Sequence, residues 1–231
     1  MRQRTLAKLF LLCVLTTAIV ALPSVVKAGK KEDKRIRKAQ RTFEDIMDSR
    51  DTAIPRSLIR KASGIIILNQ FKAGFVFGAK GGKGIVMAKD DRTQRWSPPA
   101  FLTVAEGSYG FQIGGQSIAT VFLVMSIEKL DRILRGKFKI GVDASAAVGP
   151  VGRDAEAKLG AGAAMLTYSI AKGLYAGAAF EGGLLLADDG ANEKMYGIKG
   201  ISPQDILYRQ KVKMPGSATL LIQLLQEYGG K

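Results

Sequence analysis

Residues 63–87 read SGIIILNQFKAGFVFGAKGGKGIVM, and this stretch decides the fold class. It opens with the β-branched run from Ile65 to Leu68, which is typical of a buried strand. Two more apolar runs then flank the glycine-rich residues 78–84, and that arrangement predicts a β-hairpin. We therefore expect Lys80 and Lys83 to lie at a basic hairpin tip, where charge and exposed amides attract anions.

Outside this stretch the sequence predicts both strands and helices. Strands are expected over residues 101–104, 109–113, 118–125, 138–146, 155–170 and 173–187, with the last two paired to each other. Helices are expected over residues 30–51, 55–61 and 127–135, and after the caps Ser202 and Ser217. Residues 188–190 indicate a turn. These elements predict an α+β fold, a single compact domain with helices packed on an antiparallel β-sheet or sandwich.

The composition excludes several classes of enzyme. The chain of 231 residues has no His and one Cys, Cys13. Without His it lacks a Ser-His-Asp triad, a Cys-His pair and any His-ligated metal site. The glycine-rich run also departs from the phosphate loop, because Lys83 is followed by Gly84 and not by Ser or Thr. We expect no catalytic residues, no metal and no cofactor.

Paired carboxylates are the remaining route to hydrolysis. A glycosidase needs two of them facing one cleft, and the sequence alone does not show such a pair. The carboxylates outside the charged N-terminal segment include Glu106, Glu128, Asp131, Glu156, Glu181, Asp188 and Asp189. An undescribed hydrolase is therefore kept as the third possible function, after the two binding functions given at the end of this section.

The first 28 residues have the pattern of a secretory signal peptide. A positive n-region (Arg2, Arg4, Lys8) precedes an apolar run over residues 9–22, which is short for a membrane span. Val26-Lys27-Ala28 then offers small residues at the two positions that signal peptidase reads, so cleavage is expected before Gly29. Cys13 lies too early for a lipoprotein signal. We expect an exported protein, periplasmic or secreted, and peripheral on a membrane.

Residues 30–51 are the most charged part of the chain and predict a basic amphipathic helix. An apolar stripe recurs at helical spacing, formed by Ile36, Ala39, Phe43, Ile46 and Met47. Beside and opposite this stripe lie Lys34, Arg35, Arg37, Lys38 and Arg41. Such a helix can lie on an anionic membrane surface. It can equally dock on the domain through the same stripe, and the sequence leaves both interpretations open.

The charge balance favours an anionic partner. Removal of residues 1–28 takes away four basic residues and no acidic ones, which leaves 31 basic against 20 acidic residues and a net charge of +11. An excess of this size attracts nucleic acid or anionic lipid, or simply forms a solvated basic surface. Export disfavours nucleic acid, and basic residues do not interleave with aromatic ones as in single-strand binders.

Several blocks of the sequence together resemble the SYLF domain. The opening blocks are residues 62–67 (ASGIII), 72–75 (KAGF), 81–86 (GGKGIV) and 96–100 (WSPPA). The later blocks are residues 148–153 (VGPVGR), 168–177 (YSIAKGLYAG) and 180–182 (FEG). They occur in the order and spacing of that family across about residues 40–197, which is most of the chain after residue 28.

The resemblance implies a non-enzymatic, lipid-binding module. Eukaryotic relatives bind phosphoinositides through a basic segment at the N-terminal side of the domain, and some bind actin and carry an SH3 domain. Bacterial relatives are exported and described as lipid-binding. Because this chain begins with an apparent export signal and has no SH3-like extension, we expect actin not to be a partner.

We therefore expect a signal peptide over residues 1–28, a basic helical segment over residues 29–61 and a SYLF-type domain over residues 62–231. The expected function is binding of anionic lipid at a membrane surface, and the alternative is a soluble carrier of a single lipid or apolar ligand. The candidate lipid contacts are Lys34, Arg35, Arg37, Lys38 and Arg41 of the helical segment, with Lys80, Lys83 and Arg153 in the glycine-rich turns.

Overall fold

The computed structural model describes nine stretches of the chain: residues 29–49, 53–74, 77–109, 114–135, 138–140, 146–150, 165–173, 183–209 and 211–230. The expected signal peptide over residues 1–28 and the candidate contact Arg153 lie outside these residues, so both stay predictions.

Eight strands form one sheet in the order β5-β8-β3-β2-β1-β4-β7-β6. Their bounds are β1 Gly64–Gly74, β2 Phe77–Ala88, β3 Ala100–Tyr109, β4 Gly114–Val124, β5 Phe138–Ile140, β6 Ala146–Val148, β7 Met165–Gly173 and β8 Gly183–Ala187. Every neighbouring pair is antiparallel except β6 and β7, which run parallel. The predicted α+β class and single compact domain are confirmed, with one sheet as the core element and no second sheet packed on it among the described residues.

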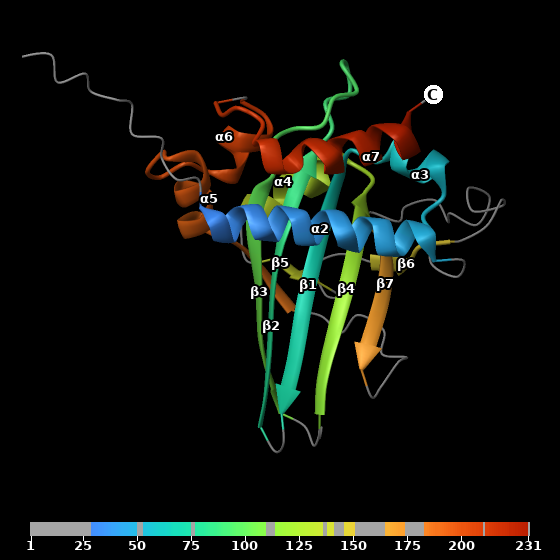
Figure 1. The fold of residues 1–231 in the computed structure, drawn as a ribbon, viewed down its shortest axis with the longest axis vertical. Helices are drawn as coiled ribbons and strands as arrows, with labels where there is room; N and C mark the ends of the chain where they lie inside the picture. The colour runs from blue at the N-terminus through green and yellow to red at the C-terminus, as the bar shows by residue number, and fades with distance from the viewer. Residues whose placement is uncertain are drawn as a thin grey trace, which may run out of the picture.

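Helices cover both faces of this sheet. On one face lie α2 Lys30–Asp48, α3 Arg56–Lys61, α5 Asp189–Tyr196, the 3-10 turn η1 Gly216–Ala218 and α7 Thr219–Gly229. The other face carries α4 Ile127–Arg135 and α6 Pro203–Leu207. Figure 1 shows α2 crossing the front of the long strands, with α7 above it. The strands continue well below the helices, so the lower part of the sheet projects beyond its helical cover.

The central strand β1 explains the apolar run that opens the deciding stretch. Ile65 and Ile67 pack toward α2, whereas Ile66 and Leu68 pack toward α4, and all four are at most 1% exposed. A strand buried on both faces needs a continuous apolar run and not an alternating one. Full burial of each such side chain contributes about 1.5–3 kcal/mol.

The expected glycine-rich turn is wrong, because residues 78–84 lie inside β2. The antiparallel pairing of β1 with β2 extends to Gly74 and Gly78, so Gly78 is already part of the second strand of the hairpin. Gly84 allows close packing: a Cβ atom there would stand 2.2 Å from the carbonyl oxygen of Ile67 and 2.4 Å from the Leu68 side chain. Sequence alone does not distinguish such a strand glycine from a turn glycine.

Two other strand predictions also need correction. The single strand expected over residues 138–146 is divided into β5 and β6, which lie at opposite edges of the sheet. Of the two strands expected to pair over residues 155–170 and 173–187, the described parts are β7 and β8, which pair with β4 and β3 and not with each other. Five residues between Ile140 and Ala146 span at most about 22 Å. Seven flat interstrand steps would need about 34 Å, so the sheet is strongly curved.

The helix predictions are closer to the structure. Helices α3 and α4 occupy the expected residues, and Ser126 Oγ accepts a hydrogen bond from the Lys129 amide at 3.3 Å. Ser202 and Asp205 form a reciprocal capping box at the start of α6. Ser217, however, does not cap α7, because it lies within η1 and its hydroxyl is buried without a partner. The expected turn at residues 188–190 is the capped start of α5.

Candidate functional site

Helix α2 is docked on the sheet through its apolar stripe. Ile36, Ala39, Phe43 and Ile46 are at most 1% exposed and belong to the core on that face. The Phe43 ring meets the ring of Tyr228 on α7 edge-on, with 5.9 Å between the ring centroids. Of the two interpretations of this helix, docking is therefore the one the structure shows, and residues 29–61 share one core with the rest of the domain.

Arg35 points into the domain and is the best-anchored cation of α2. Its Nη1 forms a salt bridge with Asp188 at 2.6 Å, and its Nη2 donates to the carbonyls of Gly84 and Leu102 at 3.1 and 2.6 Å. Its guanidinium also lies 4.9 Å from the centroid of the Phe101 ring. The side chain is 13% exposed. The Arg35 side chain thus bonds within the domain, and its burial distinguishes it from the other candidate contacts on α2.

The other four candidates form an exposed face on α2. Lys34, Arg37, Lys38 and Arg41 are all exposed, and their spacing places them opposite the buried stripe. Within the described stretches none of the four forms an ion pair. We call these four residues the basic face. Because no ion pair within the described stretches offsets their mutual repulsion, these four positive charges are available to attract an anion.

Other charged residues of α2 modify this face. Lys30 is exposed and lies one turn before Lys34 on the same side, a contribution that the sequence pattern contained and the prediction left out. Asp45 is an exposed carboxylate one turn after Arg41, and it has an interaction of its own. The basic face therefore ends toward the C-terminus of α2.

A groove runs between α2 and the uncovered part of the sheet. One hollow of about 620 Å³ is lined by all four residues of the basic face. An adjoining hollow of about 680 Å³ shares Lys38, Asn69 and Ser117 with it, so the two form one continuous groove, which we call the Asn69 groove. The Thr42 hydroxyl donates to Asn69 Oδ1 at 3.1 Å and ties the helix to the floor of this groove.

The two candidate lysines of β2 occupy different positions. Lys83 is exposed and lines the Asn69 groove together with Lys38, although it lies in a strand and not at a hairpin tip. Lys80 is placed by its backbone, which pairs with Lys72 and Glu106. The structure thus brings Lys83 to the basic face.

A second groove borders the opposite side of α2. It has a volume of about 640 Å³ and is lined by Asp33 and Arg37 of α2 and by residues that follow α5 and α6, among them Ile198, Lys213 and Met214. We call it the Met214 groove. The basic face therefore lies between two grooves.

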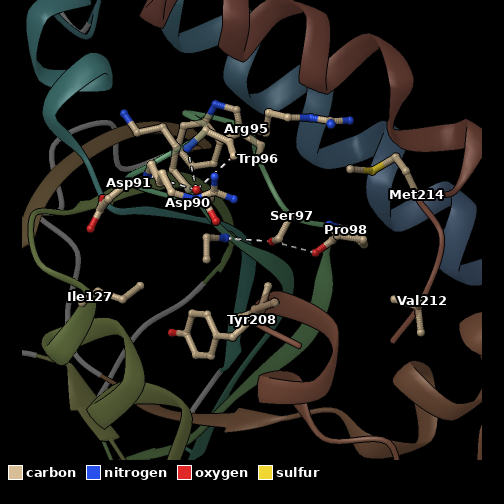
Figure 2. Close-up of a pocket in the computed structure, with 15 residues that line it drawn as sticks. Asp90, Asp91, Arg95, Trp96, Ser97, Pro98, Ile127, Tyr208, Val212 and Met214 are labelled. Carbon is tan, nitrogen blue, oxygen red and sulfur yellow. Dashed lines mark hydrogen bonds between the residues drawn. The ribbon is translucent and has the colours of Figure 1, made fainter. Parts of the chain in front are cut away.

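A third hollow, of about 650 Å³, lies where the β2–β3 connection meets the segment after α6 (Figure 2). Lys89 is buried there, and its Nζ donates to the carbonyls of Ile59 and Arg60, the latter at close range. Burial lowers the pKa of Lys89. Asp90 accepts hydrogen bonds from Thr93 and Arg92 within its own turn. These polar groups hold the local chain and do not converge on a shared reaction centre.

The blocks that carry the family resemblance have packing roles. A Cβ atom at Gly149 would stand 2.1 Å from the Tyr168 ring, whose hydroxyl donates to the carbonyl of Pro150 at 3.1 Å. Ser97 Oγ accepts from the Ala88 amide at 3.0 Å, and Tyr196 donates to the carbonyl of Pro99 at 2.6 Å. These residues therefore preserve the fold.

The described residues also bear on metal and membrane insertion. Among them, no three His, Cys, Asp or Glu side chains are grouped so that they could hold a metal ion. None of the helices described here combines the length and the apolar character that crossing a membrane requires.

Comparison with known proteins places the chain in a family. Residues 105–228 match the Ysc84 family model, described as "Las17-binding protein actin regulator". The chain is 32% identical over 214 residues to SH3 domain-containing YSC84-like protein 1 of Xenopus laevis, with 91% of this chain and 63% of that protein covered.

Two further relatives show the same extent of likeness. Protein YSC84 of Saccharomyces cerevisiae is 32% identical over 210 residues, which cover 87% of this chain and 44% of that protein. The human SH3 domain-containing YSC84-like protein 1 is 33% identical over 207 residues, which cover 87% and 60%. The chain thus spans about half to two thirds of the length of these relatives. With a family model matched over more than half of its residues and relatives aligned along most of its length, this chain belongs to the Ysc84, or SYLF-domain, family.

Proposed function

We propose that this protein is a non-enzymatic module that binds anionic lipid at a membrane surface through the basic face of α2. The observation that carries the proposal is the sorting of cations on one helix. Arg35 is paired and 13% exposed, whereas Lys34, Arg37, Lys38 and Arg41 are exposed without an ion pair among the described residues. Four exposed cations within about two turns provide a concentrated positive surface.

The expected binding is weak and sensitive to salt. Each cation near an anionic membrane contributes about 1 kcal/mol, and this contribution declines within a Debye length. The four residues of the basic face together supply roughly 3–4 kcal/mol before ordering costs, which alone corresponds to millimolar affinity. Lys83 adds to the same side. Because the apolar stripe of α2 is in the core, the helix binds while docked, and its own apolar residues contribute nothing to insertion.

Export forms part of the proposal. A signal peptide over residues 1–28 would deliver the protein to the periplasm or beyond, where membrane surfaces offer anionic headgroups. Nucleic acid would then be an inaccessible partner.

The test is co-sedimentation of residues 29–231, which contain every element described above, with vesicles of neutral lipid alone or with added anionic lipid. We expect binding to the anionic vesicles only, and its loss in the variant Lys34→Gln, Arg37→Gln, Lys38→Gln, Arg41→Gln. The matched control removes four exposed cations elsewhere, two on α4 and two in the β2–β3 connection: Lys129→Gln, Arg132→Gln, Arg92→Gln and Arg95→Gln.

The outcomes separate the candidate functions. Equal loss of binding in both quadruple variants would mean that the membrane attracts the overall positive charge of the domain and not the basic face in particular. Binding that survives the α2 variant would refute the proposal. Lipid that stays with the protein through purification, without vesicle binding, would favour the carrier instead.

A second candidate rests on the description of the family, which names a Las17-binding actin regulator. That description runs against the expectation that actin is not a partner. Co-sedimentation with actin filaments tests it directly, and the same two quadruple variants show whether any binding uses the basic face.

A further inference from the structure

Exposed apolar side chains gather around the basic face. Among the described residues, four large hydrophobic side chains are exposed: Phe71 by 57%, Leu220 by 47%, Ile198 by 41% and Met214 by 38%. Phe71 lines the Asn69 groove beside Lys38, and Ile198 and Met214 line the Met214 groove beside Arg37. Three of the four therefore lie beside the basic face, on both sides of α2.

Phe71 is exposed because β1 outruns its helical cover. Strand alternation places Phe71 on the same face as Ile65, Ile67 and Asn69, which is the face that α2 covers. Asn69 lies under α2, and two residues further along the strand Phe71 has passed the edge of the helix. Phe71 lines the Asn69 groove, where Lys83 is also exposed.

Ile198 is presented by a rigid turn. The flanking residues Gly197 and Gly200 adopt φ values of +68° and +70°, a conformation that favours glycine. The Gly197 amide donates to the carbonyl of Glu193 at 2.8 Å, and the Gly200 amide donates to its carboxylate at 2.7 Å. A β-branched apolar residue held outward on such a turn is pre-organised for contact.

The charges beside these side chains have the sign that suits an anionic surface. Lys199 and Lys213 are exposed next to Ile198 and Met214. Lys211 also lines the Met214 groove but pairs with Asp205 at 2.8 Å. The carboxylate that lines this groove is Asp33, at its α2 side. Cations therefore outnumber carboxylates around both apolar contacts.

We propose that Phe71, Ile198 and Met214 insert into the apolar boundary of the membrane while the basic face of α2 contacts the headgroups. This inference rests on the proposed function and names the residues that enter the membrane. A protein partner would be matched by one contiguous apolar patch with a polar rim. Separate apolar side chains around a cluster of cations instead match a surface of anionic headgroups over hydrocarbon.

Tryptophan quenching by brominated acyl chains reports insertion directly. The chain has one tryptophan, Trp96, which is 6% exposed and gives a constant signal. In residues 29–231, the single variants Phe71→Trp, Ile198→Trp and Met214→Trp each add a second tryptophan. The control is Lys129→Trp on α4, an exposed position that faces away on the opposite side of the sheet. We expect quenching at the three sites on brominated anionic vesicles and none at the control.

A loss variant tests the energetic contribution. Phe71→Thr, Ile198→Thr and Met214→Gln together remove the apolar side chains, keep the charges and spare strand propensity at residue 71. We expect an unchanged Tm, because all three side chains are exposed, and a Kd for anionic vesicles that rises about tenfold or more, with the larger loss at high salt.

The two proposals fail differently. Absence of vesicle binding by the wild-type protein would defeat the proposed function and the insertion together. Salt-sensitive binding with no quenching at residues 71, 198 and 214, and with the triple variant binding like wild type, would overturn the insertion alone and leave the electrostatic contact standing.

Discussion

Arg35 and Arg37 lie two positions apart on α2 in opposite environments, so one substitution made at each should have opposite effects. Arg35→Gln breaks the 2.6 Å salt bridge to Asp188 and removes the donor to the Gly84 and Leu102 carbonyls. The Arg35 and Asp188 side chains are 13% and 24% exposed, so the substitution leaves Asp188 as a mostly buried carboxylate without its cation, although it still accepts a hydrogen bond from the Ala191 amide as the cap of α5. Arg37→Gln removes an exposed charge and nothing in the core.

The magnitude follows from this geometry. Removing one partner of a fully buried pair costs about 3–5 kcal/mol, and partial exposure reduces this to about 2–3 kcal/mol here. For a domain of this size such a loss lowers the Tm by roughly 4–12 °C. Arg37→Gln should stay within about 0.5 kcal/mol of wild type. Urea denaturation and calorimetry of residues 29–231 give both numbers.

Vesicle binding should show the reverse order. Arg37→Gln should weaken binding to anionic vesicles, whereas Arg35→Gln, measured below its Tm, should bind like wild type. Equal stability of the two variants would refute the role of Arg35 as the anchor of α2. Equal loss of vesicle binding would refute the division of the cations into one anchor and four surface contacts.

Three other predictions address packing, pH and processing. Gly84→Ala should destabilise the domain by about 1–3 kcal/mol, because its Cβ would stand 2.2 Å from the Ile67 carbonyl, whereas Gly190→Ala, with open space around its Cβ, should be nearly neutral in the same melt. The Lys211 ammonium, the Arg209 guanidinium and the Ser202 hydroxyl hold the pKa of Asp205 well below its usual value of 3.8. Because the pKa of Asp205 is lower in the folded state than in the unfolded state, its ionised carboxylate stabilises the fold above pH 3.8, and this stabilisation is lost as the pH falls. The amount by which Asp205→Asn lowers the Tm should therefore be largest at neutral pH and shrink below pH 3.8. A difference in Tm that does not change with pH would contradict this. Intact mass of the exported protein should correspond to a chain that begins at or near Gly29, and a mass that retains residues 1–28 or adds acyl chains would exclude that cleavage.

Local patterns in the sequence predicted the elements better than their arrangement. The caps at Ser126 and Ser202 and the amphipathic stripe of α2 depend on residues a few positions apart, so the pattern alone located those helices. The strand glycines were predicted as a turn, because the close contacts that explain Gly82 and Gly84 are made with Gln70, Ile67 and Leu68 on the neighbouring strand β1. Strand order, including the separation of β5 from β6, depends on pairings between distant segments and has no local signal.

The candidate site shows the same division. Charge and helical spacing correctly placed four of the five α2 cations on an exposed face. They did not single out Arg35, because its partner Asp188 is 153 positions away in the sequence. The exposed Phe71, Ile198 and Met214 were missed as well, since each is a residue type typical of a core. Their exposure depends on tertiary structure: Phe71 lies where β1 extends beyond α2, and Ile198 and Met214 lie in the segments after α5 and α6.

The distance between Arg35 and Asp188 also has a kinetic consequence. The first described helix gains its anchoring carboxylate only after most of the chain has been synthesised, and β8, which leads into Asp188, joins the sheet beside β3. Native contacts between segments this remote carry a large loop-closure cost, and they slow folding. Until residue 188 reaches the sheet, Arg35 lacks its carboxylate partner, although the apolar stripe of α2 can already pack on β1 and β2, which follow it closely in the sequence. The salt bridge that anchors α2 is therefore among the last contacts that a growing chain can make, whereas the apolar contacts of the same helix become available early.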